Sequence, residues 1–191
     1  FFKGSEYLKP LADAIQRKIR VSFDYHAYQK ALPDHYAVAP YLVMEHRNRW
    51  YLLGHDEEAD KVKTFGLDRM QQVQLLQPYL EAAPFDYKKL FEHTYGITCL
   101  EEAPSQVVLS FTPQQGKYIK SLPLHHSQQI LLDNEDELRI SLLVVLNYDL
   151  KMQLLSYGSK VEVLEPPQLR QEITEELQKA VKKYAGMTEF G

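Results

Sequence analysis

Residues 50–54, Trp50-Tyr51-Leu52-Leu53-Gly54, are the most informative stretch of this 191-residue sequence. Aromatic and large aliphatic residues in such a run favour a β-strand. A polar turn at residues 47–49 precedes the stretch, and the acidic segment 56–60 follows it. Both flanks are typical of hairpin connections, so we predict a strand at residues 50–54 that has a partner strand on each side.

Four further short strands are predicted around this one. Residues 21–25 alternate strictly between apolar and polar side chains, which indicates a half-buried strand. The other strands are predicted at residues 36–44, 62–65 and 70–76. Apolar residues at helical spacing predict a helix over residues 7–18, within an N-terminal helical region 1–18. Five short strands behind one helix predict a small closed antiparallel β-barrel over residues 19–78.

The second half of the sequence has a different order of elements. Prolines punctuate residues 79–104, which we interpret as a linker with a short helix at residues 86–93. Residues 105–191 then show the order strand, helix, strand, strand, helix, strand, which is the ferredoxin-like pattern, followed by an extra C-terminal helix. The strands are predicted at 106–111, 127–132, 138–146 and 160–164, and the helices at 114–121, 149–157 and 166–184. The predicted fold class is therefore α+β, with two domains.

Composition excludes several classes of protein. The formal net charge is -4, so a strongly basic nucleic-acid binder is not indicated, and any site for a polyanion must be a local cluster. The single cysteine, Cys99, forms no intramolecular disulfide and indicates a reducing, cytoplasmic setting. No apolar run approaches the roughly 20 residues of a membrane helix, so no membrane association is expected.

Motifs for catalysis or for metal binding are missing from the sequence. The seven histidines are scattered. The adjacent pair His125-His126 would point to opposite faces of a strand, so the two rings would not bind one ion together. There is no Gly-x-Ser-x-Gly elbow and no glycine-rich phosphate loop. We therefore expect no metal, no cofactor and no catalytic residues, and the protein is not predicted to be an enzyme.

Several stretches resemble one known family. Trp50-Tyr51-Leu52 matches the tripeptide after which the WYL domain is named, and its context matches the family in order, at residues 19–25, 38–41 and 63–70. Residues 123–128, 154–158 and 161–166 resemble the extension that follows this domain in many bacterial transcriptional regulators. The resemblance implies a Sm-like or SH3-like antiparallel β-barrel followed by a ferredoxin-like domain, in agreement with the order of elements above.

The resemblance also implies a function. Such a protein would be the ligand-sensing and dimerising part of a transcriptional regulator, expected to form a homodimer. Its barrel would bind single-stranded nucleic acid or a nucleotide to control DNA binding. In that family a helix-turn-helix domain that contacts duplex DNA usually precedes the barrel, and residues 1–18 are too few to hold one.

The candidate ligand-binding residues of the barrel are cationic or aromatic. Cations neutralise phosphate groups and aromatic rings stack on bases. The candidates are Tyr25, Arg47, Arg49, Trp50, Tyr51, His55, Lys63 and Arg69.

Each candidate also has a purely structural interpretation. Trp50 is expected to lie largely in the core, Tyr25 suits core packing as well as site lining, and Arg69 would pair with Asp68. Arg47 and Arg49 suit a solvated turn, whereas Lys63 stands where the family more commonly has arginine.

Two other functions stay open at the level of sequence. The module could serve only in oligomerisation and hold no ligand, or it could sense an anion other than a nucleotide. The strand at residues 127–132, if it lies at a sheet edge, could pair with a second chain. The apolar stripe of the C-terminal helix suits packing inside its own domain or a dimer interface, and the sequence does not distinguish the two.

Overall fold

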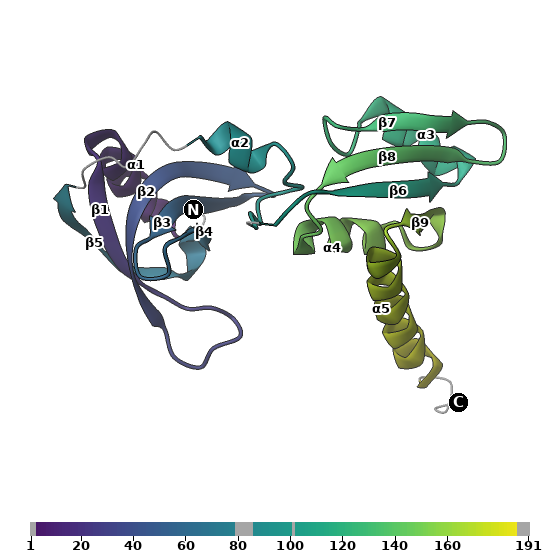
Figure 1. Cartoon of the computed structure of the whole chain (residues 1–191). Helices are drawn as coiled ribbons and strands as arrows, with labels where there is room; N and C mark the ends of the chain where they lie inside the picture. The colour runs from purple at the N-terminus through teal and green to yellow at the C-terminus, as the bar shows by residue number, and fades with distance from the viewer. Residues whose placement is uncertain (1–2, 79–85, 101, 187–191) are drawn as a thin grey trace. The chain divides into compact units, whose positions relative to one another are not determined.

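The computed structural model describes residues 3–78, 86–100 and 102–186. The chain forms two compact units, Phe1–Tyr87 and Lys88–Gly191, each with its own hydrophobic core (Figure 1). Both are mixtures of helices and antiparallel strands, which confirms the predicted α+β class. Because the positions of the two units relative to each other are not determined, each is described by itself.

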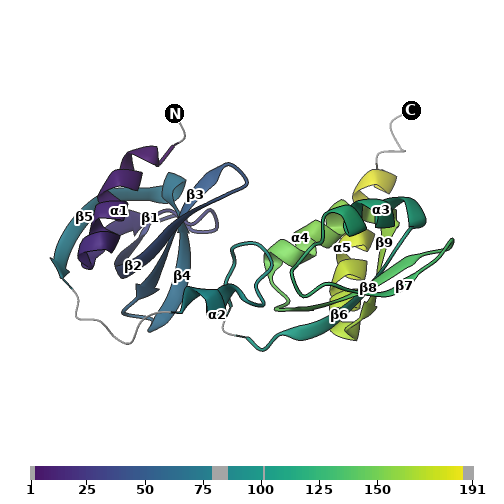
Figure 2. The same ribbon diagram turned by 90° about the horizontal axis from the view of Figure 1, so that it is seen from above.

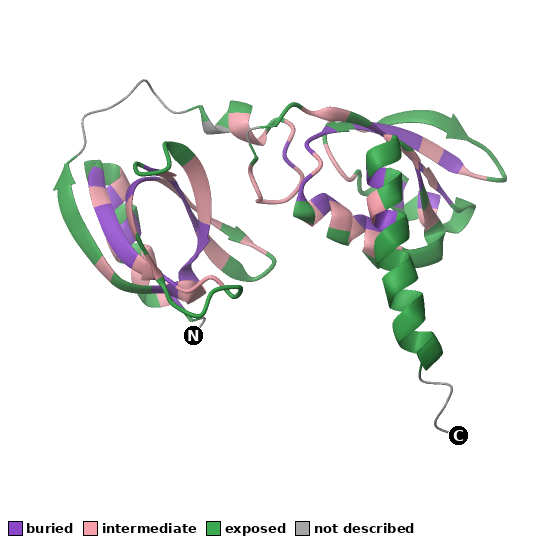
Figure 3. Ribbon diagram, turned by 60° about the horizontal axis from the view of Figure 1, so that its bottom comes forward, coloured by how far each residue is buried: buried purple, intermediate pink, exposed green. Residues whose placement is uncertain are grey.

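The first unit is built on a five-stranded antiparallel sheet in the order β4-β3-β2-β1-β5. Figure 3 shows this sheet curling round on itself as a barrel, and the short 3-10 helix η2 joins the outer strands β4 and β5. The elements are η1 (Ser5–Tyr7), α1 (Leu8–Arg17), β1 (Ile19–Tyr25), β2 (Asp34–His46), β3 (Arg49–Asp56), β4 (Lys61–Gly66), η2 (Leu67–Arg69) and β5 (Met70–Pro78).

The hairpin between β2 and β3 is tighter than the sequence suggested. Arg47 and Asn48 both have positive φ, at 48° and 67°. Two central residues of this kind match the twist of the flanking strands in a two-residue turn. Pairing therefore continues to His46 and Arg49, and β2 is longer than the predicted segment 36–44.

Helix α1 packs on β1, β2 and β5 and contributes Leu11 and Ala14 to the core of the first unit (Figure 2). Four aromatic rings lie together inside the barrel, with several edge-to-face contacts between them. They belong to Phe23, Tyr25, Tyr36 and Phe65. Such contacts add to the stabilisation that comes from burying the rings. The cluster forms a rigid aromatic wall behind the loops described below.

The second unit has a four-stranded antiparallel sheet in the order β7-β8-β6-β9. With its strands numbered along the chain, this order is 2-3-1-4, which is the ferredoxin-like arrangement. Buried residues of α3, α4 and α5 share one core with the sheet. The elements are β6 (Ser105–Phe111), α3 (Pro113–Ser121), β7 (Gln129–Asp133), β8 (Leu138–Val144), α4 (Tyr148–Ser156), η3 (Gly158–Lys160), β9 (Val161–Glu165) and α5 (Pro167–Ala185).

Much of the predicted linker is attached to the second unit. Helix α2 (Tyr87–Phe91) begins this segment. The buried Asn147 donates to the carbonyl oxygens of Tyr95 at 2.7 Å and Thr98 at 2.9 Å. Asp149 accepts from the backbone N–H groups of Ile97 and Thr98. The segment therefore has fixed partners in the unit that it precedes, whereas residues 79–85 and 101 lie outside the described residues.

Candidate anion-binding site

Strand register brings two distant loops of the first unit together. β1 pairs with β5 so that Tyr25 lies opposite Met70. One residue further along, the N–H group of His26 donates to the carbonyl oxygen of Arg69 at 3.0 Å. The loop that follows β1 therefore runs beside η2, although some 40 residues separate the two segments in the sequence.

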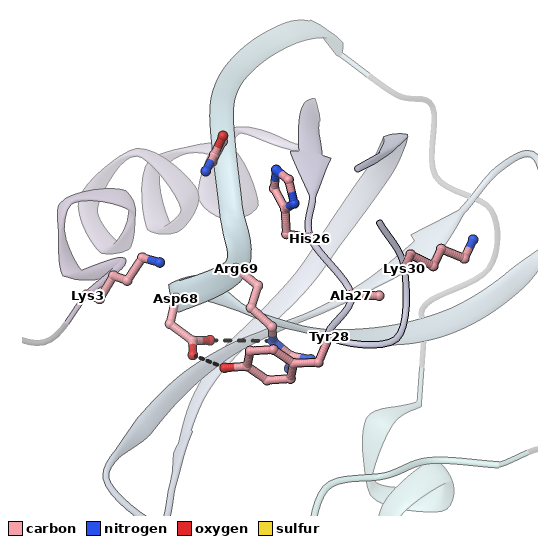
Figure 4. A pocket seen from close by; sticks show the side chains of 8 residues that line it. Lys3, His26, Ala27, Tyr28, Lys30, Asp68 and Arg69 are labelled. Atoms are coloured by element: carbon pink, nitrogen blue, oxygen red, sulfur yellow. Dashed lines mark hydrogen bonds and ion pairs between the residues drawn. The ribbon is translucent and has the colours of Figure 1, made fainter. Parts of the chain in front are cut away.

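The guanidinium group of Arg69 contacts two tyrosine rings at this junction, and Figure 4 shows it beside one of them, Tyr28. Its guanidinium carbon is 5.1 Å from the ring centre of Tyr25 and 5.0 Å from that of Tyr28. Distances of this kind are typical of cation–π contacts. The Arg69 side chain is 23% exposed, and its buried Nε has no hydrogen-bond partner among the described residues.

The two rings that enclose Arg69 differ in environment. Tyr25 is buried, and burial raises the pKa of its hydroxyl group. That hydroxyl accepts a hydrogen bond from the N–H of Gly66 at 3.2 Å, which fixes the ring as the inner wall. Tyr28 is 75% exposed, so its outer face is free to stack on a planar ligand.

Asp68 is the acidic partner of the site. Its carboxylate accepts a hydrogen bond from the Tyr28 hydroxyl at 3.2 Å. The same carboxylate lies 3.6 Å from Nε of Arg69 and 3.9 Å from Nη1 of Arg49. These two contacts are ion pairs longer than a hydrogen bond, so Asp68 neutralises the arginines only in part.

Tyr28, Asp68 and Arg69 line a pocket of 310 Å³, whereas Tyr25 and Arg49 are not part of its lining. Three cationic side chains face one carboxylate there, since Lys3 and Lys30 join Arg69 and Asp68 in the lining. Lys30 is also bound by Asp34, with Nζ and Oδ2 2.6 Å apart. The pocket is thus a local positive cluster on a protein of net charge -4. Its full lining is Lys3, His26, Ala27, Tyr28, Lys30, Asp68, Arg69 and Gln71.

Of the candidate residues predicted from sequence, the structure groups Tyr25, Arg49 and Arg69 around Asp68. Tyr51 is half-buried and pairs in register with Gly66, just before η2. Trp50 packs against the barrel core.

Of the eight candidates only Arg69 is part of the pocket lining, and the remaining three lie at other positions of the barrel. Arg47 is an exposed residue of the β2–β3 turn. His55 bonds to Asp60 at 3.0 Å. Lys63 binds the buried Asp56 at 2.6 Å and lies over the ring of Tyr36.

Sequence reasoning missed several residues of the pocket, namely Lys3, His26, Tyr28, Lys30 and Gln71. Asp68 was considered only as a partner that would neutralise Arg69. The sequence feature that could have located these residues is the pairing of strands. A prediction that β1 pairs with β5 places the residues after Tyr25 next to those before Met70.

Among the described residues, no group of three or more His, Cys, Asp or Glu side chains is placed to hold a metal ion. None of the described helices has the length and apolar character needed to cross a membrane.

The fold and the pocket define a class of two-domain proteins in which a small β-barrel with a cationic, aromatic site precedes a ferredoxin-like unit. The sequence profile of the WYL domain matches residues 6–75, and that of the WCX domain matches residues 103–181. The chain therefore carries a WYL domain followed by a WCX domain.

The solved structures similar to the chain include those of two differently named proteins. Proteasome accessory factor B/C (PafBC) of Arthrobacter aurescens is 21% identical, with a TM-score of 0.43 over 95% of this chain and 28% of that chain. A CRISPR Cas-related protein is 11% identical, with a TM-score of 0.54 over 97% of this chain and 52% of that chain. This chain thus spans about half or less of the length of these proteins. No curated protein sequence matches it.

Proposed function

We propose that this chain is the ligand-sensing and dimerising module of a cytoplasmic transcriptional regulator. The WYL barrel binds single-stranded nucleic acid or a nucleotide-like anion. Binding then alters duplex DNA binding by a helix-turn-helix domain that lies outside this sequence. The observation that carries the proposal is the position of Arg69, enclosed by Tyr25 and Tyr28 at a pocket with a surplus of cations.

The chemistry of the pocket suits a nucleotide better than a simple anion. The exposed face of Tyr28 offers a platform on which a base stacks, a contact worth about 1–3 kcal/mol. Arg69 and Lys3 lie in the same pocket and would neutralise the adjoining phosphate. A ligand with a planar ring next to a phosphate would satisfy both features at once.

Asp68 gives the site selectivity. An approaching phosphate competes with this carboxylate for Arg69 and Arg49. A neutral ligand has no charge with which to displace the carboxylate and would bind weakly. The resulting affinity is expected to fall with added salt, since the phosphate contacts release bound counterions.

Titration of the full chain with a fluorescently labelled single-stranded oligonucleotide, at low and at moderate salt, tests the proposal. Arg69→Ala should weaken binding about tenfold or more, and Arg69→Lys should restore only part of it because lysine lacks a planar group that stacks between rings. Arg17→Ala removes the same charge from an exposed position on α1, outside the pocket lining, and serves as the matched control. Equal binding by all three variants and the original chain would refute the proposal.

A second function, oligomerisation without a ligand, is favoured by one feature. Arg49 and Arg69 both lie within 4 Å of Asp68, so part of the positive charge is already compensated. Native mass spectrometry distinguishes the two functions, since it reports a retained ligand and the oligomeric state together. A retained anion without a base, which no oligonucleotide displaces, would identify the module as a sensor of a non-nucleotide anion.

A further inference from the structure

The last three turns of α5 extend beyond the core of the second unit (Figures 1 and 3). Leu169 and Ile173, near the start of the helix, are buried. From Thr174 to Gly186 every residue is exposed. The apolar side chains on this part of the helix are therefore exposed in the second unit.

The exposed part of α5 still carries an apolar stripe. Leu177, Val181 and Tyr184 are spaced four and three residues apart and continue the face of Leu169 and Ile173. Their exposed fractions are 39%, 65% and 76%. A helix end that stays in solvent does not need an apolar stripe, whereas a helix that packs against a partner buries one.

A groove lies beside the same stripe. Helices α4 and α5 enclose a volume of 430 Å³. Its apolar lining includes Tyr148 and Met152, which are exposed, and the half-buried Leu155. Its acidic lining consists of Glu172, Glu175 and Glu176. One of these, Glu172, is paired with Lys151 of α4.

The charges of α5 are divided along its length. Near the groove α5 carries Glu172, Glu175 and Glu176, together with Arg170, which is already paired with Glu162 of β9. The exposed half carries Lys179, Lys182 and Lys183. Two such helices that pack side by side in parallel would place like charges together. In an antiparallel pair, the basic half of each helix lies along the acidic half of the other.

We infer that this surface, defined as the α4–α5 groove together with Leu177, Val181 and Tyr184, binds the same surface of a second copy of the chain. The two α5 helices cross a two-fold axis in antiparallel orientation. Val181 then lies near Leu177 of the second copy, and Lys182 and Lys183 lie near its Glu176 and Glu175. An isologous contact of this kind closes at two copies.

This inference rests on the dimerisation in the proposed function and supplies the surface for it. It is independent of the pocket around Arg69, because that pocket belongs to the other unit. A variant that loses only self-association should therefore still bind the oligonucleotide. Conversely, Arg69→Ala should leave self-association unchanged.

Analytical ultracentrifugation of the full chain over a range of concentrations tests the surface. Val181→Glu should raise the dimer dissociation constant at least about tenfold, because a carboxylate would be buried in an apolar contact. Leu131→Glu is the matched control. It introduces the same charge at an exposed aliphatic residue of β7, at the edge of the sheet. Circular dichroism checks that both variants keep their helices.

A charge exchange provides a second test. A chain with Lys182→Glu and Lys183→Glu should be monomeric, and so should a chain with Glu175→Lys and Glu176→Lys. Mixing the two should give a heterodimer, since each basic segment then faces an acidic one again.

The outcomes distinguish a failure of the proposed surface from a failure of the proposed dimerisation. If Val181→Glu leaves the dimer intact, or if Leu131→Glu disrupts it instead, the proposed surface is wrong, although the chain still dimerises. A chain that is monomeric at every concentration overturns both, and the oligonucleotide titration is unaffected in either case. Failure of the exchanged chains to associate overturns the antiparallel arrangement.

Discussion

Gly66 lies so close to Arg69 that a β-carbon on the glycine would come within 2.7 Å of Nη2 of the guanidinium group. The same β-carbon would be 2.7 Å from Oδ1 of Asp68. Gly66 has φ -71° and ψ 126°, values that any residue adopts. The missing side chain, and not an unusual backbone conformation, is therefore what lets Arg69 lie between the two tyrosine rings.

Gly66→Ala should consequently impair binding more than folding. The methyl group displaces Arg69 and Asp68, and the loss of a charged contact to the ligand costs about 1.5–3 kcal/mol, or roughly tenfold to a hundredfold in affinity. The midpoint of thermal unfolding should change little. Oligonucleotide titration and thermal unfolding measure the two effects. Gly186→Ala, with no atom near its added β-carbon, is the control. Unchanged affinity in Gly66→Ala would contradict the role of this close contact.

Asp68→Asn should strengthen anion binding. The variant removes the carboxylate that competes with the ligand for Arg49 and Arg69. An increase of about threefold to tenfold in affinity at low salt is expected, as for a change of about 1 kcal/mol between partly exposed charges. Asp13→Asn makes the same charge change at an exposed position of α1 and should have no effect. Weaker binding by Asp68→Asn would mean that the carboxylate holds the site in shape and does not compete for it.

Lys63→Met should affect stability and leave binding unchanged. The substitution leaves the buried Asp56 without its cation, for which a loss of about 1–3 kcal/mol in unfolding free energy is expected, since Lys63 is partly exposed. Urea denaturation measures the loss. If Lys63→Met instead weakened oligonucleotide binding as much as Arg69→Ala, Lys63 would belong to the ligand site.

The effect of Lys63→Met should depend on pH. Burial raises the pKa of Asp56, but hydrogen bonds from Lys63 and from the N–H groups of Ala59 and Glu58 outweigh it, and the net pKa is lowered. A carboxylate with a lowered pKa stabilises the folded state at pH values above its unfolded-state pKa of 3.8. This stabilisation is lost as the pH falls through the pKa of the folded state. The difference in unfolding free energy between the original chain and Lys63→Met should therefore shrink on acidification. A constant difference from pH 7 to pH 3 would argue against the ion pair.

Asn147→Ala should destabilise the second unit by about 2–4 kcal/mol. The amide donates to two backbone oxygens and caps α4 by accepting from the N–H of Leu150 at 2.9 Å. Its loss leaves buried polar groups without partners. Thr112→Ala removes the cap of α3 at an exposed position, where a loss of about 1 kcal/mol is expected. Denaturant unfolding measures the loss of unfolding free energy in each variant. Equal losses in the two variants would show that the position of residues 95–98 does not depend on Asn147.

The stability of the second unit should fall between pH 6.5 and pH 4. Burial, and then the neighbouring His126 and His93, lower the pKa of His125 from 6.5 to about 4. The N–H of Ser127 donates to Nδ1 of His125, which requires that nitrogen to be unprotonated. The unfolded chain therefore binds the proton more readily in this range, and stability is lost as pH decreases. In urea denaturation, His125→Gln should make the unfolding free energy depend less steeply on pH. An equally steep dependence in this variant would mean that other groups cause it.

The sequence by itself determined the elements and the fold class. Apolar alternation and turn residues located the strands of both units to within a few residues, because these patterns are local consequences of strand and helix geometry. The extent of β2 was missed, since the positive φ values of Arg47 and Asn48 are a property of the turn that no local pattern of hydrophobicity reports.

Only the tertiary structure decided which side chains meet. Tyr25 and Arg69 were candidates from sequence, but Tyr28 joined them through the pairing of β1 with β5, and Lys3 through the packing of η1 against η2. Lys63 was a candidate alongside Arg69 in the sequence, yet the β3–β4 hairpin gives it the buried carboxylate of Asp56 as a partner. The chemistry of a charged side chain depends on its neighbours, and strand register between segments far apart in the chain selects those neighbours.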